Sequence, residues 1–408
     1  MLKGIINVAF LVLLFSHVGL SSRPTDVNAA VLAHIASLGF FLLLLFAAGA
    51  SSKRGVFVHR YFGWIALFLL YFFSVGVLIS AKTGAPLREI FEFPYRIANL
   101  GIALLYPTWM ASREDARFLL RAGFALVLAQ LVRDVIVGGV VFGAAILTQR
   151  LAGEQFASLF VHATLGFILG WAVADWDLIK RNRWLQFLLG FALLLFLAKI
   201  LLMYSRLVWF VILPVDLVLV LLIARRQGEV GGRVMKAVGV VAVVGVIMVL
   251  LNSDVRDTMV YRLSYVDYSV QIKLDEFAAV AAASARDPIL GRGFSGELEF
   301  WKGRRYRRQA HVHNMFLQFL LSSGIVGLTI FLWGGGLLVS GAWRLARRAQ
   351  DPVEVGATLA VLLTVANFLM QGQVQSLFRR EHTYLLIAFC LILLVTTDRF
   401  RRASEPVT

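Results

Sequence analysis

Two histidines and an asparagine stand where a long polar segment meets an apolar run. They are His311, His313 and Asn314, in the stretch from Ala310 to Gln318. Five cations lie within seven residues just upstream: Lys302, Arg304, Arg305, Arg307 and Arg308. Imidazole exchanges a proton near neutral pH, and clustered Arg and Lys side chains bind phosphate. The combination predicts proton-transfer chemistry on a phosphate-bearing substrate at a membrane surface.

His313 directly precedes the apolar run 314–343, which we expect to be a membrane helix. A helix N-terminus carries partial positive charge, which favours anions and keeps a nearby imidazole neutral, as a general base requires. The alternative is an interfacial histidine that only caps the helix or reaches to the headgroups. The neighbouring His311, Asn314 and the basic run favour the base.

The composition predicts a polytopic helical membrane protein. The chain has 408 residues, of which 59% are hydrophobic and 16% are charged. A soluble domain has roughly 45–50% apolar and about 25% charged residues. Apolar runs of about 20 residues between short charged loops are typical of membrane helices. The net charge of +16 is explained by loops that orient the helices and contact anionic lipid, so we expect membrane lipids as partners and no nucleic acid.

We expect an all-α fold with about twelve transmembrane helices and one long periplasmic loop that contains helical segments. Cations concentrate in alternate loops, which by the positive-inside rule places both termini in the cytoplasm. Three regions follow: helices one to nine in 1–251, the periplasmic loop in 252–313, and the last three helices with the tail in 314–408. Within the loop, 265–285 has apolar spacing suited to a helix that lies on the membrane or packs on the bundle. The predicted spans are 5–20, 30–49, 61–80, 96–111, 118–140, 158–174, 184–203, 207–224, 236–251, 314–343, 354–374 and 383–398.

Several other polar residues are candidates for a site. Arg206 lies between two apolar runs, where it either faces the bundle or reaches out to lipid phosphate. Arg262 starts the loop helix, where a solvated arginine is the simplest interpretation. Arg292 lies in a glycine-rich stretch that predicts a tight loop and no dinucleotide site, because no βαβ unit surrounds it. Gln371 could bind sugar hydroxyls or a neighbouring helix.

Metal and cofactor motifs are absent from the sequence. Cys390 is the lone cysteine, so neither an intrachain disulfide nor a cysteine metal site is possible. No H-E-x-x-H, G-x-S-x-G or P-loop occurs, and we find no acidic D-x-D cluster of the kind that binds a metal–nucleotide complex. We therefore expect no metal and no cofactor, with cationic side chains binding the phosphate.

Three stretches resemble motifs of the O-antigen ligase/polymerase superfamily of bacterial envelope glycosyltransferases. They are Ser205 to Trp209, Pro288 to Gly293, and His313 to Gln318 followed by Ser323 to Leu328. The resemblance covers about residues 200–345. It implies a GT-C-like membrane enzyme that transfers a glycan from undecaprenyl diphosphate on the periplasmic face of the bacterial inner membrane.

The resemblance also implies residue roles. His313 would be the general base on the acceptor hydroxyl, and Arg206 and Arg262 would hold the donor diphosphate. Attack opposite the leaving group would invert the anomeric centre without a metal. His311, Asn314, Arg292, Gln371 and the five upstream cations would contact substrate.

Two alternatives stay open. A ligase uses a lipid A–core acceptor and a polymerase uses another lipid-linked glycan; the basic run favours the ligase, because lipid A and the inner core are phosphorylated. A twelve-span transporter or flippase would have two similar halves and a midplane site, whereas here polar features gather on one surface.

Overall fold

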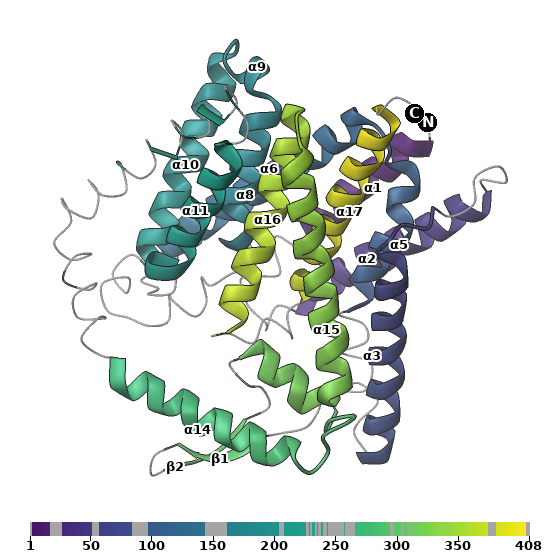
Figure 1. Cartoon of the computed structure of the whole chain (residues 1–408), viewed down its shortest axis with the longest axis vertical. Helices are drawn as coiled ribbons and strands as arrows, with labels where there is room; N and C mark the ends of the chain where they lie inside the picture. Colours follow the sequence, from purple (N-terminus) through teal and green to yellow (C-terminus); the bar gives the residue numbers. More distant parts are fainter. Residues whose placement is uncertain are drawn as a thin grey trace.

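The computed structural model describes residues 2–16, 27–50, 57–83, 97–142, 161–203, 208–225, 266–293, 298–302, 305–309, 312, 314–373 and 381–404, with isolated positions between 228 and 257. This part of the chain is helical, as expected, except for one β hairpin (Figure 1). In chain order, its main elements are α1 (Leu2–Ser16), α2 (Val27–Ala50), α3 (Phe62–Thr83), α6 (Arg113–Phe142), α8 (Val161–Ala174), α9 (Trp176–Ile179), α10 (Arg183–Met203), η4 (Val208–Ile212), α11 (Leu213–Ala224), α14 (Val266–Ser284), β1 (Leu298–Lys302), β2 (Arg305–Gln309), α15 (Met315–Arg348), α16 (Pro352–Gly372) and α17 (Glu381–Ser404).

Helix α16 lies at the centre of the bundle and packs against α6, α8, α11, α15 and α17. Its contact with α8 is close because both helices present glycine. A Cβ at Gly356 would stand 2.3 Å from the carbonyl oxygen of Gly170, and one at Gly170 would stand 2.5 Å from that of Gly356. Small residues let membrane helices approach at backbone distance, where dispersion contacts drive their association.

The helices of the described part agree with most of the predicted spans. Five of them are long and apolar enough to cross a membrane, within α3, α10, α15, α16 and α17. The loop helix predicted over 265–285 is confirmed as a helix, α14. The total of twelve spans stays a prediction, and most of the span predicted over 236–251 lies outside the described residues.

The span predicted over 96–111 is helical but irregular. Here the chain runs through three consecutive pieces: a 3-10 turn η2 (Asn99–Gly101), α5 (Ile102–Leu105) and a second 3-10 turn η3 (Tyr106–Trp109). Pro107 has no backbone N–H for a helical hydrogen bond. Hydropathy alone does not register these changes of helix type, because the residues of all three pieces are mostly apolar and buried.

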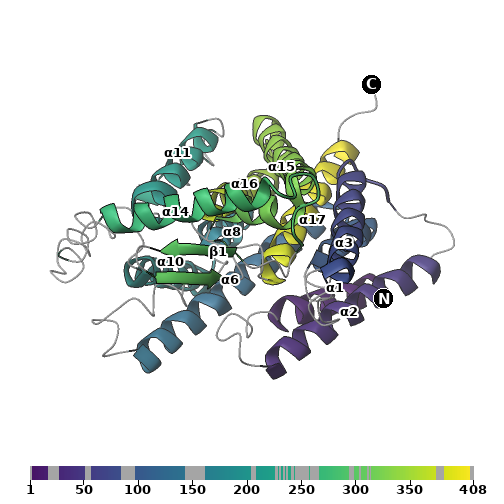
Figure 2. The same ribbon diagram turned by 90° about the horizontal axis from the view of Figure 1, so that it is seen from below.

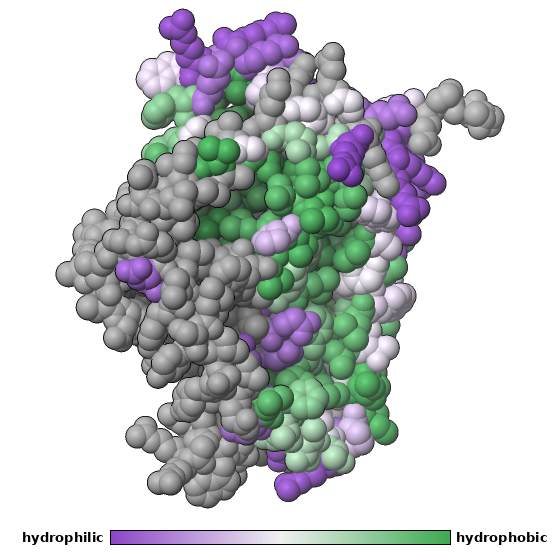
Figure 3. Space-filling model, turned by 60° about the vertical axis from the view of Figure 1, so that its left-hand side comes forward, coloured by the Kyte–Doolittle hydropathy of each residue, from purple (hydrophilic) through white to green (hydrophobic). Residues whose placement is uncertain are grey.

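The bundle has two different ends. The start of α1 and the end of α17 lie at one end, which we call the terminal end, while α14 and the hairpin lie across the opposite, loop end (Figure 1). Seen from below, α14 and the two strands cross in front of the bundle (Figure 2). On the face shown in Figure 3, hydrophobic residues cover most of the coloured middle, with a few hydrophilic residues among them, and hydrophilic residues gather toward the two ends.

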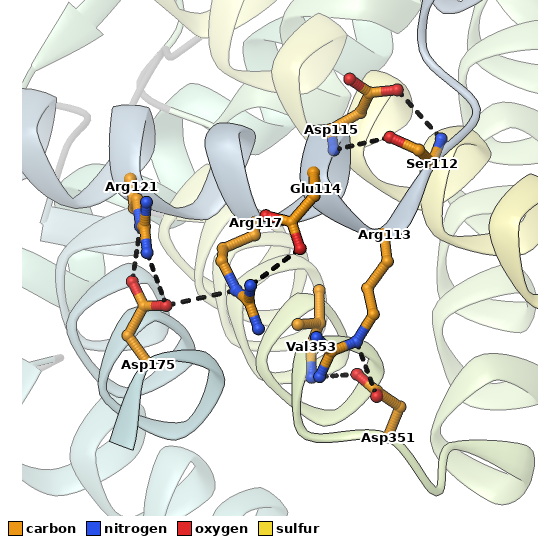
Figure 4. A network of polar contacts seen from close by, with 9 residues as sticks. All are labelled: Ser112, Arg113, Glu114, Asp115, Arg117, Arg121, Asp175, Asp351 and Val353. Carbon is orange, nitrogen blue, oxygen red and sulfur yellow. Dashed lines mark hydrogen bonds and ion pairs between the residues drawn. The ribbon is translucent and has the colours of Figure 1, made fainter. Parts of the chain in front are cut away.

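Ion pairs connect the helices at the terminal end (Figure 4). Asp175, which is buried, accepts two hydrogen bonds from Arg121, at 2.7 and 3.0 Å. Arg117 approaches the same carboxylate at 3.3 Å, and Arg113 joins α6 to Asp351 before α16 at 2.8 Å. Arg113, Arg117 and Arg121 therefore fasten α6 to its neighbours.

Removing the buried carboxylate is expected to destabilise this end. Asp175→Ala leaves two arginines without their shared partner and should lower the free energy of unfolding by about 1–3 kcal/mol. Thermal unfolding of the purified protein in detergent measures the change. Asp177→Ala is the matched control, because the Asp177 side chain is 76% exposed and pairs with Lys180 within one helical turn, so a change within about 0.5 kcal/mol is expected. Equal effects of the two substitutions would contradict this account.

Candidate functional site

Asn314 caps the N-terminus of α15 and joins it to α16. Its Oδ1 accepts hydrogen bonds from the backbone N–H groups of Phe316 and Leu317, at 2.9 and 3.1 Å. Its Nδ2 donates to the carbonyl oxygen of Gln373, just past the end of α16, at 3.0 Å. An asparagine cap satisfies N–H groups that the first helical turn leaves free. The Oδ1 atom of Asn314 therefore caps α15, and its Nδ2 atom binds the residue that follows α16.

Gln318 fixes the chain on the other side of position 313. The side chain is 1% exposed, and its Oε1 accepts the backbone N–H of Val312 at 2.7 Å. Its Nε2 donates to Oγ of Ser322 at 2.8 Å, one turn further along α15. Because Val312 and Asn314 are both tied to α15, the backbone positions on either side of residue 313 are fixed by hydrogen bonds.

Helix α15 is two helices joined at a break. Gly324 has φ 63° and ψ −167°, which no helix residue adopts, and the chain bends there (Figure 1). The short segment 315–323 lies at the loop end, and the long segment that follows runs through the bundle. A break of this kind leaves backbone groups without their helical partners, and these need other partners when buried.

The loop 288–293 supplies those partners. The N–H groups of Arg292 and Gly293 donate to the carbonyl oxygens of Leu321 and Ser322, at 2.8 and 3.0 Å. In return, the N–H group of Ile325 donates to the carbonyl oxygen of Pro288 at 2.9 Å. The hydroxyl of Tyr71 on α3 donates to the carbonyl oxygen of Ser323 at 2.8 Å.

Glycine is required on both sides of this contact. A Cβ at Gly324 would lie 2.1 Å from the carbonyl oxygen of Ile289, and one at Gly291 would lie 2.5 Å from the backbone nitrogen of Gly324. Gly291 and Gly293 also have positive φ, at 71° and 80°. The tight loop predicted from the glycine-rich stretch is confirmed. Together, the loop 288–293 and the broken part of α15 at 321–325 form a set of backbone hydrogen bonds that we call the interlock.

The hairpin and α14 cover the short segment of α15. Val280 and Ala283 of α14, Leu298 of β1, Val312 and Leu321 form a small buried cluster separate from the main core. The hairpin pairs Leu298 with Gln309 through to Lys302 with Arg305, antiparallel. The basic run, expected in an all-α loop, thus lies on two β strands, which carry Lys302, Arg305, Arg307 and Arg308. A strand pair was not foreseen because the run has no alternation that separates it from a charged loop.

Helix α16 holds two distant parts of the chain together. Near its end, Asn367 donates from Nδ2 to Oδ2 of Asp216 on α11 at 3.0 Å, and both side chains are buried. Asp216 lies in the first turn of α11, which directly follows η4. Helix η4, which starts at Val208, two residues after Arg206 in the sequence, also contacts α16. Gln373, six residues or about 9 Å beyond Asn367, contacts Asn314. Helix α16 and the residue that follows it therefore contact both η4 and Asn314.

Not all predicted site residues can be placed. His311, His313, Arg206, Arg262 and Arg304 lie outside the described residues. Arg292 is half-buried, and its backbone is fixed to the short segment of α15. Gln371 is buried at the end of α16, two residues before Gln373, which contacts Asn314. Gln318 and Tyr71 were missed as site residues; Gln318 stands in the His313–Gln318 motif, which could have signalled it, but Tyr71 carries no sequence signal.

No group of three or more metal-binding side chains occurs among the described residues. At the loop end, the described cations are arginines and lysines next to a capped helix N-terminus, a combination that suits anions such as phosphate. The described helices define a multi-pass membrane protein with a group of polar contacts at the loop end of its bundle.

Comparison with known families supports the resemblance inferred from the motifs. Residues 191–332 match the model of the O-antigen ligase family, which confirms that resemblance. The matched region runs from α10 into the long segment of α15 and indicates the O-antigen ligase/polymerase superfamily. None of the curated proteins matches the chain significantly.

A methyl group at the break should loosen the interlock. Gly324→Ala would place a Cβ against the carbonyl oxygen of Ile289 in a positive-φ conformation, a strain of about 1–3 kcal/mol. Hydrogen–deuterium exchange should then become faster in 288–293 and in 315–323. Gly336→Ala is the control, since Gly336 lies within the same helix with open space around its Cβ. Unchanged exchange in Gly324→Ala would show that the interlock does not depend on this glycine.

Proposed function

We propose that the protein is an inverting, metal-independent glycosyltransferase that ligates O-antigen glycan to a lipid A–core hydroxyl, using undecaprenyl diphosphate as the glycan carrier. The main support is the match of residues 191–332 to the O-antigen ligase family, together with α16 and Gln373 after it, which contact η4 and Asn314 within that region. The multi-span fold suits two lipid-linked substrates that cannot leave the membrane.

His313 acts as the general base. The acceptor hydroxyl attacks the anomeric carbon, a C–O bond forms, and the bond from that carbon to the diphosphate oxygen breaks. The hydroxyl proton passes to the imidazole of His313, and undecaprenyl diphosphate leaves with the electron pair. A positioned base contributes about 10²–10⁴-fold to such a step. Attack opposite the leaving group inverts the anomeric configuration.

Arginines stabilise the leaving group. Arg206 and Arg262 hold the diphosphate by charge-assisted hydrogen bonds, which strengthen as negative charge develops on the leaving oxygen. Arg292 is tied by its backbone to the segment that starts next to His313, so its cationic side chain adds to the same field. Gln371, buried at the end of α16, offers an amide to a sugar hydroxyl.

The cationic hairpin receives the acceptor. Lys302, Arg305, Arg307 and Arg308 are concentrated on two five-residue strands, with Arg304 and His311 close by in the sequence. Phosphates of lipid A and the inner core suit such a surface. In this assignment the loop 252–313 and the loop end face the periplasm, and both termini lie on the cytoplasmic side of the inner membrane.

Purified protein with undecaprenyl-diphosphate glycan and lipid A–core tests the proposal. Glycan-capped lipid A–core should appear, and His313→Ala should abolish it while the protein remains folded. The control is His34→Ala, which removes a histidine on α2 that belongs to none of the motifs, and it should retain transfer. Longer lipid-linked glycan in place of capped core would indicate a polymerase. No product, with movement of the donor across vesicles, would indicate a transporter. Normal transfer by His313→Ala would remove this residue as the base.

Gln318 is a positioning residue in this scheme. Gln318→Met keeps the volume but loses the hydrogen bonds to Val312 and Ser322, so residue 313 should be displaced. A displacement of about 1 Å can cost roughly 100-fold, so kcat should fall by about 10- to 100-fold while KM for the donor changes little.

The control keeps the chemistry of the substitution and changes its place. Gln186→Met removes another side-chain-to-backbone hydrogen bond, to Lys180, at the terminal end. It should leave kcat unchanged. A role of Gln318 in stability alone would lower the melting temperature of Gln318→Met without changing kcat of the folded enzyme.

A further inference from the structure

We infer that α14 and the loop after it form a membrane-inserted surface, which dips into the lipid leaflet at the loop end. The surface, called here the α14 patch, consists of an apolar stripe on α14 together with two residues of the following loop. Its members are Leu274, Phe277, Ala278, Ala281, Ala285, Ile289 and Leu290. The sequence left open whether this helix lies on the membrane or packs on the bundle, and its two faces allow both.

One face of α14 packs on protein. Glu276, Val280, Ala283 and Ser284 are buried, and Val280 and Ala283 belong to the cluster with the hairpin and the short segment of α15. These four positions follow helical spacing and lie on one side of the helix. This face accounts for how α14 is held in place.

The opposite face is apolar and exposed. Leu274, Phe277, Ala278, Ala281 and Ala285 follow the spacing of one helix face and include no polar residue. Leu274 and Phe277 are 56% and 55% exposed. A helix on the surface of a soluble protein has polar residues on its outer face. An outer face of this composition is favourable only where another apolar medium covers it.

The patch continues the lipid-facing surface of α15. Ile289 is 62% exposed, and its carbonyl oxygen lies 3.5 Å from the N–H group of Val326 within the interlock. Ile325 beside it is also exposed, as is Trp333 two turns further along this membrane-spanning helix. Because Ile289 of the patch contacts a spanning helix at a point where the helix also exposes apolar residues, lipid is the occupant that fits.

Exposed cations border the patch. Lys273 and Arg286 stand at the two ends of the apolar stripe. Long cationic side chains at the edge of an inserted helix reach the lipid phosphates while their neighbours enter the acyl region. Helix α14 also runs across the loop end of the bundle, as a helix in the membrane surface does (Figures 1 and 2).

Insertion would set the height of the site. The other face of α14 and the interlock are both fixed to the segment of α15 that begins next to residues 313 and 314. The depth of the patch in the leaflet therefore fixes the depth of those residues. This consequence, unlike the insertion itself, rests on the proposed function: it brings His313 to the level of the diphosphate of a lipid-linked donor.

Spin labels on single cysteines test the insertion directly. The native Cys390 is fully buried, so a cysteine placed on the surface is labelled selectively. Phe277→Cys and Leu290→Cys are labelled in protein reconstituted into phosphatidylcholine–phosphatidylglycerol vesicles. Collision of each label with oxygen, which partitions into lipid, is compared with collision with a water-soluble nickel chelate.

Two matched positions calibrate the measurement. Phe73 is 50% exposed on the spanning helix α3, so a label on Phe73→Cys gives the oxygen-to-nickel ratio expected in lipid. A label on Lys180→Cys, at the terminal end, gives the ratio expected in water. Labels at 277 and 290 should have an oxygen-to-nickel ratio close to that of Phe73→Cys. A ratio like that of Lys180→Cys would overturn the inference. Low collision with both reagents would also overturn it, since protein would then cover the patch.

A second measurement separates insertion from catalysis. The double variant Phe277→Ser/Leu290→Ser should lose transfer with donor embedded in vesicles but retain it with donor in detergent. If the labels give lipid-like ratios but the double variant loses transfer equally in vesicles and in detergent, the patch is inserted but does not set the depth of the site. If the parent protein transfers no glycan, the proposed function fails, and the label ratios still decide whether the patch is inserted.

Discussion

A helix that breaks inside a packed bundle leaves backbone groups that must find new partners, and most of the loop end depends on how α15 meets this constraint. The break at Gly324 frees carbonyl oxygens and N–H groups in a place that water does not readily reach. The loop 288–293 and the hydroxyl of Tyr71 form hydrogen bonds with these freed backbone groups. Because both partners come from other parts of the chain, the break fixes the loop, the short segment and α3 relative to one another.

Polar groups are distributed unequally along the bundle. At the terminal end, buried acids such as Asp175 are neutralised by arginines from neighbouring helices, so charge is used for assembly. At the loop end, neutral amides make the main contacts, through Asn314, Gln318 and Asn367. Amides fix geometry without adding charge.

Hydropathy and helical spacing were sufficient to predict most helices, and α14 was predicted within a residue at each end. These features depend on local composition. The break in α15 could not be predicted, because a glycine within an apolar run is compatible with a straight helix until the loop that fills the break is known. The three pieces over 99–109 and the hairpin were missed for related reasons. Of the site, motif spacing identified Asn314 and the glycine loop, while Tyr71 contributes through a contact 252 residues away in sequence.

The contacts of α16 have a consequence for how such proteins can be divided. The family match ends at residue 332, inside α15, whereas the helix that joins its two motif stretches begins at Pro352. The recognisable segment is therefore not a modular unit that could be excised or exchanged by itself. A chimera joined at the limits of the family match would separate Asn314 and Asp216 from their hydrogen-bond partners, Gln373 and Asn367. Exchange is better made at the terminal end, in the turn between α15 and α16, or with α16 included.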